Sequence, residues 1–253
     1  FNQTNNIIVK GLKITSGGTT YGRLITYTGS SDLKILDNTL VGAASGQSTS
    51  SYLAAFYYNS TSAYPTGTWV IKGNDITDVS YGFYIYGNSA NNLDTLRIED
   101  NTLATWYYGM YSYYHKNPKI LNNTFNKLGG STNIYGYNYL YYPSGNAEFK
   151  GNTINGYRYG CYMYASAGSQ TWDVQDNTLN EVGYYGFYIS NSSAGRAEKV
   201  TLKNNSISMN LVSTFAYGLY LGYVDGAQGR SEVSNNMINI DMPSTSTVYT
   251  FYA

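Results

Sequence analysis

The sequence predicts an all-β solenoid of about nine parallel coils, and three observations lead to this prediction. A short segment recurs along the chain, most clearly at 172–189, where Trp-Asp-Val-Gln-Asp-Asn-Thr-Leu is followed by a bend and then by Tyr-Gly-Phe-Tyr-Ile. Within each copy apolar and polar residues alternate, which is typical of strands. One copy alone buries little apolar surface, whereas stacked copies share a continuous core, so the repeats favour a stacked architecture.

An asparagine marks the predicted turn of each coil except the first, where Leu12 takes the same slot. These anchors are Asn38, Asn74, Asn101, Asn123, Asn152, Asn177, Asn205 and Asn236. An apolar residue lies two positions after each slot, at Ile14, Leu40, Ile76, Leu103, Phe125, Ile154, Leu179, Ile207 and Ile238. Another lies three positions before it, at Val9, Ile35, Ile71, Ile98, Ile120, Phe149, Val174, Leu202 and Val233. Only the spacing between anchors varies, so we expect the variation to lie in loops.

The elements follow in order along the chain. We expect the first strand and turn at 7–14, polar loops at 45–51 and 59–68, and the tightest coils at 69–113. Residues 135–139 fit two registers, and the pattern then holds from Ala147 to Ile238. Asparagine tolerates left-handed backbone and bonds neighbouring backbone groups, so we expect the anchor itself to form the bend. Stacked amides can also hydrogen bond to each other along the axis, as a ladder.

With these Asn-Thr-Ile/Leu coils, the sequence resembles the right-handed parallel β-helix, or pectate-lyase-like, superfamily, and in particular its carbohydrate-binding and sugar-hydrolysis repeats. The resemblance covers nearly all of residues 7–241 and implies a right-handed parallel β-helix. It implies no single activity, because the superfamily includes lyases, hydrolases, phage spikes and non-catalytic adhesins.

Composition argues against several classes of function. The net charge is zero, which gives no electrostatic footprint for nucleic acid. No apolar run approaches the roughly 18–20 residues of a membrane span, so we expect no membrane insertion. Cys161 is the single cysteine of the chain and falls in an inward slot, where it behaves as a small hydrophobe. Without a second His or Cys, or an Asp-rich calcium repeat, we expect no metal and no cofactor.

The 31 tyrosines concentrate in a second motif, Tyr-Gly-x-Tyr, at 81–84, 108–111, 159–162, 185–188 and 217–220, with partial versions at 135–136 and 21–22. Alternation places one outward column at Tyr84, Tyr111, Tyr162, Tyr188 and Tyr220, and a second at Tyr57, Tyr86, Tyr113 and Tyr164. Exposed aromatic surface of this kind marks binding sites, so these tyrosines are candidate contacts for a glycan or a partner protein. Tyrosine is also a good strand former that stacks along a ladder, and this purely structural role stays open.

Two carboxylates are the candidates for catalysis. Glu148 and Asp173 occupy the same outward slot of adjacent coils, so their backbones should lie about 4.8 Å apart, near the separation in a retaining glycosidase pair. Lys119 and Lys150 lie close to them in the slot alignment, which favours the alternative of a solvated charge ladder. Asp37, Asp100 and Asp176 precede their anchors and are expected to support the turns.

The enzyme signatures of the superfamily are absent from the sequence. Polygalacturonase-like members carry Asn-Thr-Asp, Asp-Asp and Gly-His-Gly, whereas Asn-Thr here is followed by Leu, Phe or Ile. Pectate lyases need a calcium-binding acid cluster beside an arginine, and Arg158, Arg196 and Arg230 have no such cluster in the slot alignment. His115 has no acidic neighbour in sequence, so we expect a loop residue rather than a catalyst.

We therefore expect residues 1–253 to form one β-helix domain, either a segment of a longer extracellular chain or a unit that stacks end to end. Its expected role is non-catalytic, structural and adhesive, at the cell surface or outside the cell, with glycans or proteins as partners. Two alternatives remain: a polysaccharide-degrading enzyme or phage spike that uses Glu148 and Asp173, and a purely structural filament subunit.

Overall fold

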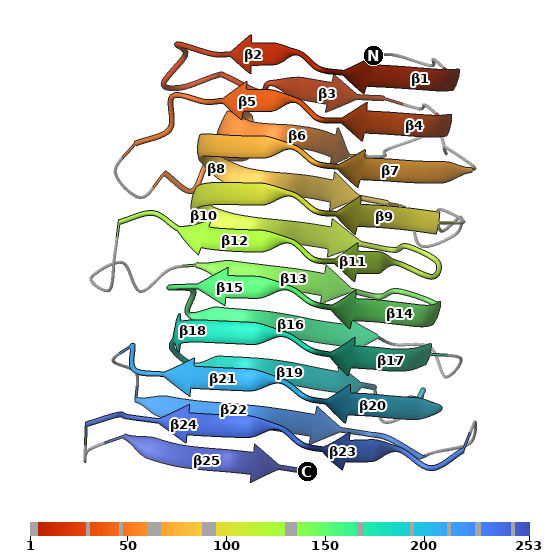
Figure 1. Cartoon of the computed structure of the whole chain (residues 1–253), viewed down its shortest axis with the longest axis vertical. Helices are drawn as coiled ribbons and strands as arrows, with labels where there is room; N and C mark the ends of the chain where they lie inside the picture. The colour runs from red at the N-terminus through yellow and green to blue at the C-terminus, as the bar shows by residue number, and fades with distance from the viewer. Residues whose placement is uncertain are drawn as a thin grey trace.

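A computed structural model describes residues 5–28, 31–45, 48–59, 67–87, 95–129, 136–165, 170–192, 195–211, 214–225, 229–243 and 246–253. The chain winds into a parallel β-helix whose coils stack along the longest axis, with the first and last coils at opposite ends (Figure 1). The predicted all-β solenoid is therefore confirmed. The only helix among the described residues is one short 3-10 turn, η1 (Ser51–Leu53).

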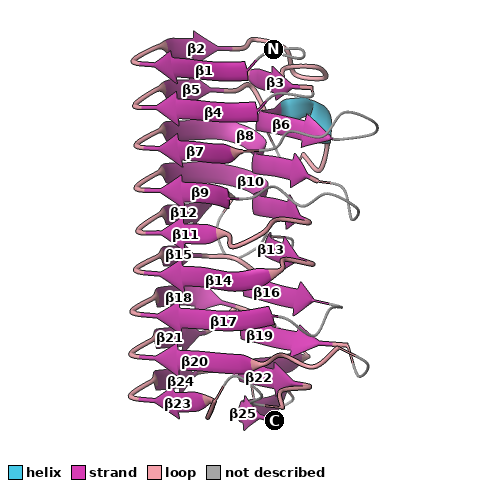
Figure 2. Ribbon diagram, turned by 90° about the vertical axis from the view of Figure 1, so that its right-hand side faces the viewer, coloured by secondary structure: helices cyan, strands magenta, loops and turns pink. Residues whose placement is uncertain are grey.

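The first sheet contains nine parallel strands, each leading into an anchor slot. In sheet order these are β1 (Asn5–Lys10), β4 (Ser31–Leu36), β7 (Thr68–Lys72), β9 (Thr95–Glu99), β11 (Lys119–Leu121), β14 (Gly145–Lys150), β17 (Gln170–Gln175), β20 (Lys199–Lys203) and β23 (Glu232–Ser234). They run together along one side of the stack in Figure 2.

The second sheet has sixteen strands and bends around the core. Its anchor side follows the turns, with β2 (Lys13–Thr15), β5 (Thr39–Val41), β12 (Thr124–Lys127), β15 (Thr153–Asn155), β18 (Thr178–Val182), β21 (Ser206–Met209) and β24 (Met237–Ile240). Its other side comprises β3 (Ile25–Tyr27), β6 (Ala54–Asn59), β13 (Tyr137–Tyr141), β16 (Tyr159–Ala165), β19 (Tyr185–Asn191), β22 (Phe215–Gly222) and β25 (Thr247–Tyr252). The long strands β8 (Asp75–Tyr86) and β10 (Thr102–Tyr113) continue through both sides and join them.

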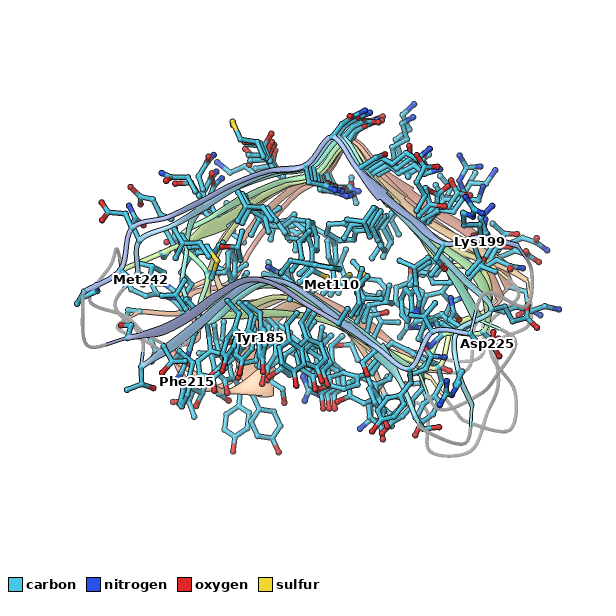
Figure 3. The ribbon with its side chains drawn as sticks, turned by 90° about the horizontal axis from the view of Figure 1, so that it is seen from below. Met110, Tyr185, Lys199, Phe215, Asp225 and Met242 are labelled. Carbon is cyan, nitrogen blue, oxygen red and sulfur yellow. The ribbon has the colours of Figure 1, made fainter. Side chains whose placement is uncertain are left out.

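The two predicted apolar columns stack in register and form the core. Every residue two positions after an anchor pairs with its equivalent in the next coil, as in Leu103 with Phe125. The same holds three positions before the anchor, as in Ile98 with Ile120. Trp69 and Trp172 are the largest side chains that this core buries fully. Figure 3, viewed along the axis, shows apolar side chains such as Met110 filling the space between the sheets.

The anchor asparagines form a continuous hydrogen-bonded row at the corner between the two sheets. In each, Nδ2 donates to Oδ1 of the next asparagine, from Asn38 to Asn236, over 2.8–3.1 Å. The same Oδ1 also accepts the backbone N–H of the preceding anchor, as Asn74 does from Asn38 at 3.0 Å. A side-chain ladder of this kind satisfies buried polar groups that the turn would otherwise leave without partners.

The bend at each turn differs from the prediction in one respect. Positive φ belongs to the residue before the anchor and not to the anchor itself, as at Asp37, Asp100 and Asp176, with φ of 54°, 53° and 58°. In other coils the position is taken by Asn or Gly, such as Asn122 and Gly151. Asp, Asn and Gly are the residues that tolerate left-handed backbone, which frees the anchor side chain to build the row.

The strand pairing defines the register of the irregular coil, which contains β13. In β13, Tyr137 pairs with Tyr108, Asn138 with Met110 and Tyr139 with Tyr111, with a shift in register after Tyr108. This coil is therefore one residue shorter than the Tyr-Gly-x-Tyr coils beside it. The partial motif predicted at 135–136 is out of register, since Tyr137 takes the motif's first position, while position 135 itself lies outside the described residues.

Candidate functional site

Tyrosines form three columns on the outer side of the second sheet, and we name this surface the tyrosine face. The first column contains Tyr81, Tyr108, Tyr137, Tyr159, Tyr185, Tyr217 and Tyr249. The second contains Tyr57, Tyr84, Tyr111, Tyr139, Tyr162, Tyr188, Tyr220 and Tyr252. The third contains Tyr86, Tyr113, Tyr141 and Tyr164. In Figure 3 their rings, Tyr185 among them, project away from the core.

The predicted columns need two corrections. Tyr57 pairs with Tyr84 and so belongs to the second column, whereas Asn59 is the residue that pairs with Tyr86. The pair Tyr21-Gly22 is not a copy of the motif, because Ile25 pairs with Phe56, which pairs with Phe83. In the motif, Tyr81 lies two residues before Phe83, whereas Tyr21 lies four residues before the equivalent Ile25. Tyr21 therefore does not align with the first position of the motif.

The first column escaped the sequence prediction because the strand does not alternate strictly at the motif. Phe83 is in the core and a Cβ on Gly82 would meet the buried Leu103 side chain, so two consecutive residues point inward. Tyr81 therefore lies on the same side as Tyr84 and packs with it, at 5.5 Å between ring centroids. In the sequence, this column is marked by the tyrosine at the first position of every Tyr-Gly-x-Tyr motif.

The glycine of the motif is explained by two obstacles, a backbone carbonyl of the next coil, such as Thr250 O at 2.6 Å from a Cβ on Gly218, and the opposite wall of the core. A Cβ on Gly186 would lie 2.9 Å from Ile207 Cγ2, and a Cβ on Gly218 would lie 2.7 Å from Ile238 Cγ2. Both isoleucines are the residues two positions after an anchor. Since real Cβ atoms do not approach other atoms this closely, only glycine lets the tyrosine strand reach the anchor side of the coil.

Within the second column the rings form two stacked runs. Tyr57, Tyr84 and Tyr111 stack with centroids 4.8 and 4.9 Å apart. A second run joins Tyr162 to Tyr188 at 4.0 Å, Tyr188 to Tyr220 at 4.4 Å, and Tyr220 to Tyr252 at 5.1 Å. Tyr139, from the short coil, separates the runs because its ring is tilted by 40° from Tyr111 and by 59° from Tyr162.

This packing decides which part of each phenol reaches solvent. Inside the stacked runs, the ring faces of Tyr84, Tyr188 and Tyr220 are covered by the rings of the coils above and below, which leaves their edges and hydroxyls exposed. Tyr81 and Tyr108 are only 8% and 7% exposed, while most other members are half-buried. The tyrosine face therefore offers rows of hydroxyls at the spacing of the strands, about 4.8 Å, and few open ring faces.

Burial in the tyrosine face raises the pKa of several of its phenols, which keeps these phenols neutral at physiological pH. Burial, followed by the charge of neighbouring phenolates, raises the pKa of Tyr84 to about 12, and the same causes raise the pKa of Tyr185 further. Burial also raises the pKa of Tyr108 and Tyr139 well above the ordinary value. Ionisation of one of these rings would be opposed by charge on the next, so these four phenols act as hydroxyl donors and carry no negative charge.

One cation borders the tyrosine face at its N-terminal end. The Arg23 guanidinium lies 3.3 Å from the ring centroid of Tyr57 and 4.8 Å from that of Tyr52, and its Nε donates to Ser51 O at 3.1 Å. Beside it, a hollow of about 480 Å³ is lined by Ser16, Tyr21, Gly22, Arg23 and Tyr52. Tyr21 and Tyr52 are 69% and 48% exposed, so here the aromatic rings are open to solvent.

The two candidate carboxylates lie on the first sheet, on strands other than those of the tyrosine face. Glu148 and Asp173 pair in register on β14 and β17. Lys119 contacts Glu148 at 2.7 Å, and Lys150 bridges both acids, at 3.2 Å to Glu148 and 2.5 Å to Asp173. Gln175 donates a further hydrogen bond to Asp173.

The electrostatics of this pair differ from those of a glycosidase. Burial alone would raise the pKa of Glu148, but hydrogen bonds and charge from Lys119 and Lys150 hold it below its ordinary value. A general acid for glycosidic cleavage needs a raised pKa, so that it carries a proton near neutral pH. The arrangement is that of an ion-paired ladder along the first sheet.

His115 and Cys161 are both enclosed. His115 is fully buried, its Nε2 lies 3.3 Å from Ile85 O, and burial lowers its pKa to about 4. Cys161 is buried and free, and burial raises the pKa of its thiol. Neither side chain reaches solvent to meet a substrate.

Among the described residues, no group of three or more His, Cys, Asp and Glu side chains is placed to hold a metal ion. No helix in the same part of the chain has the length and hydropathy needed to cross a membrane.

Comparison with known proteins bears on the fold. Neither the curated proteins nor the solved structures include a match to this chain. A family model described as the right-handed β-helix region matches residues 50–207, more than half of the 253 residues. The match covers most of the tyrosine face and agrees with the expected pectate-lyase-like superfamily. With its stacked parallel coils and asparagine corner, the chain belongs to the right-handed β-helix family.

Proposed function

We propose that this β-helix is a non-catalytic structural and adhesive rod that acts outside the cell or at its surface, and that its tyrosine face binds a neutral glycan. The observation that carries the proposal is the long array of phenol edges and hydroxyls that the three tyrosine columns present along the second sheet.

The chemistry of this face favours a glycan. A neutral polysaccharide presents hydroxyls and C–H groups in a repeating order, and the face presents hydroxyls and ring edges in a repeating order. Tyrosine combines an apolar body with a polar tip, which suits both kinds of contact. Because the phenols stay neutral, the face neither repels an acidic polymer strongly nor attracts a basic one.

The rigidity of the face also supports the proposal. The rings are held by neighbours on the same face, as Tyr188 is between Tyr162 and Tyr220, and the backbone is fixed by the asparagine row. A surface that is already ordered loses little entropy on binding. Many weak contacts along one rigid rod then add up when the ligand is a polymer.

The test is binding to a panel of neutral polysaccharides, by affinity electrophoresis and by calorimetry with oligosaccharides. We expect Tyr111→Ala combined with Tyr188→Ala to weaken binding by on the order of tenfold, since aromatic anchors dominate such interfaces. Tyr21→Ala, outside the columns, is the matched control and should bind like the parent, and circular dichroism should show that each variant folds. If the double variant binds every ligand of the parent unchanged, the face is not the binding site.

The same experiment separates the remaining roles. If the chain captures a protein partner but no glycan, and the double tyrosine variant loses this capture, the tyrosine face binds a protein and not a glycan. Oligosaccharide released from a polysaccharide, and abolished by Glu148→Gln, would make the chain an enzyme. Filaments seen by negative stain without any bound glycan would indicate a purely structural subunit that associates end to end.

A further inference from the structure

The run of Tyr162, Tyr188 and Tyr220 is the most closely stacked part of the tyrosine face. Its rings are nearly parallel, tilted by 6° between Tyr162 and Tyr188 and by 8° between Tyr188 and Tyr220. The centroid distance of 4.0 Å between Tyr162 and Tyr188 is shorter than in the run from Tyr57 to Tyr111, where the rings are 4.8 and 4.9 Å apart. Two phenols on adjacent coils are thus held face to face, with nearly parallel rings.

The hydroxyls of this run are connected as well. Burial raises the pKa of Tyr162, and a hydrogen bond with the Tyr188 hydroxyl raises it further. Burial and the charge of Tyr188 raise the pKa of Tyr220, which also hydrogen bonds with Tyr188. A phenol that loses an electron must also lose its proton, and water can accept it here because both residues are partly exposed.

We propose that Tyr162 and Tyr188 form a site of oxidative cross-linking, at which a peroxide-dependent one-electron oxidant joins the two rings as dityrosine. Each phenol gives up one electron and its hydroxyl proton, which leaves two phenoxyl radicals. Their spin density lies partly on the carbons ortho to oxygen, and a carbon–carbon bond forms between one such carbon of each ring. Both rings then lose the hydrogen on that carbon as a proton and regain a hydroxyl hydrogen. Overall, two phenols and one hydrogen peroxide give one biphenol and two molecules of water.

The geometry favours this pair over others on the face. Fixing two reacting groups beside each other replaces a bimolecular encounter by a step within one molecule, which raises the rate by orders of magnitude. Tyr139, the neighbour of Tyr162 on the other side, is tilted by 59° with its centroid 5.5 Å away. Both rings of the proposed pair are partly exposed, so a small oxidant reaches their edges.

The bond would fasten one coil to the next. Tyr162 lies on β16 and Tyr188 on β19, which pair in parallel. The single cysteine of the chain is buried and free, so no disulfide performs this task. A covalent link between coils restricts the unfolded chain and so favours the folded state.

The experiment treats the dilute, folded chain with a haem peroxidase and hydrogen peroxide, and follows dityrosine fluorescence. Cleavage after glutamate separates the two tyrosines, because Glu181 lies between them, and yields peptides 149–181 and 182–198. We expect these peptides to be recovered as one linked species with two hydrogen atoms fewer than their sum, and fragmentation to place the link at Tyr162 and Tyr188.

Three phenylalanine variants complete the test, since phenylalanine keeps the stacked ring but forms no phenoxyl radical. Tyr188→Phe and Tyr162→Phe should each lose the linked species. Tyr185→Phe, in the same peptide as Tyr188 but inclined by 75° to Tyr159, should retain it. The proposal is overturned if the link persists in Tyr188→Phe, if it is found only between separate chains, or if it forms equally well in protein unfolded by urea.

Discussion

Asn123 donates its side-chain amide to Oδ1 of Asn152 at 3.0 Å, while its own Oδ1 accepts both the backbone N–H and the side-chain amide of Asn101. Every contact of Asn123 in this row is buried. We expect Asn123→Ala to destabilise the fold by about 3 kcal/mol, because it leaves two donors of Asn101 buried without an acceptor. Unfolding in denaturant measures the change.

The matched control for this prediction is Asn180→Ala. Asn180 also bonds an asparagine of the adjacent coil, Asn155, at 2.9 Å, but it is exposed and water can replace the partner. We expect this variant to lose less than about 1 kcal/mol. Equal losses in the two variants would mean that the buried row adds no particular stability.

Gly186→Ala tests the origin of the Tyr-Gly-x-Tyr motif. The added methyl group would meet Gly218 O and lie 2.9 Å from Ile207 Cγ2, so the two walls of the core must separate. We expect a loss of about 1–3 kcal/mol, the usual cost of overpacking, visible as a lower midpoint of thermal unfolding. Gly17→Ala, where nothing lies within 4 Å of the new atom, should leave the midpoint unchanged.

His115 should make stability depend on pH. Burial lowers its pKa to about 4, so between its ordinary pKa and this value only the unfolded chain binds the proton. The free energy of unfolding is therefore highest above about pH 6.5 and falls as the pH drops toward 4, by about 2 kcal/mol between pH 7 and pH 5. Urea titrations across this window measure the slope, and His115→Gln, which does not titrate, should flatten it. A slope unchanged in the variant would assign the effect to other groups.

Lys150→Ala tests the charge ladder. Lys150 Nζ lies 3.2 Å from Glu148 and 2.5 Å from Asp173. Burial alone would lower the Lys150 pKa, but hydrogen bonds to the two acids raise it above its ordinary value. The variant leaves two carboxylates side by side, and we expect a loss of about 1 kcal/mol at low salt that shrinks in molar salt. A loss that does not respond to salt would point to packing of the lysine chain instead.

The sequence was sufficient to predict the coils, because period-two alternation states directly which side chains point inward. Ile98, Ile120 and Phe149 could be aligned from their distance to an asparagine alone, and the strand pairing confirms that alignment. A row of stacked amides could be expected for the same reason. The identity of the left-handed residue could not, since Asp, Asn and Gly before the anchor are as compatible with a bend as the anchor itself.

The tyrosine face does not follow from alternation alone, because its first column lies where alternation fails. The Gly-x pair of the motif places two consecutive residues inward, which conceals Tyr81 and its equivalents from a strict alternation rule. Alternation predicts the wrong column for Tyr57 because its strand, Ala-Ala-Phe-Tyr, lacks the motif. In β13 one residue is missing, and no periodicity tells on which side of Asn138 the deletion falls. His115 is buried by contacts distant in sequence, which local pattern does not report.

The corner asparagines all face the same way, since from Asn38 to Asn205 each NH₂ group donates one hydrogen to the asparagine oxygen of the following coil. The other hydrogen of the group bonds a backbone carbonyl of the preceding coil, as Asn74 does with Ile35. Their dipoles therefore add along the axis, as peptide dipoles do in an α-helix. The rod consequently has an electrical polarity, with its positive pole toward the C-terminal coil. A coil added with its asparagine reversed would bring two amide oxygens, or two NH₂ groups, against each other at this corner. The row therefore requires every added coil to have the same orientation as the coils already present.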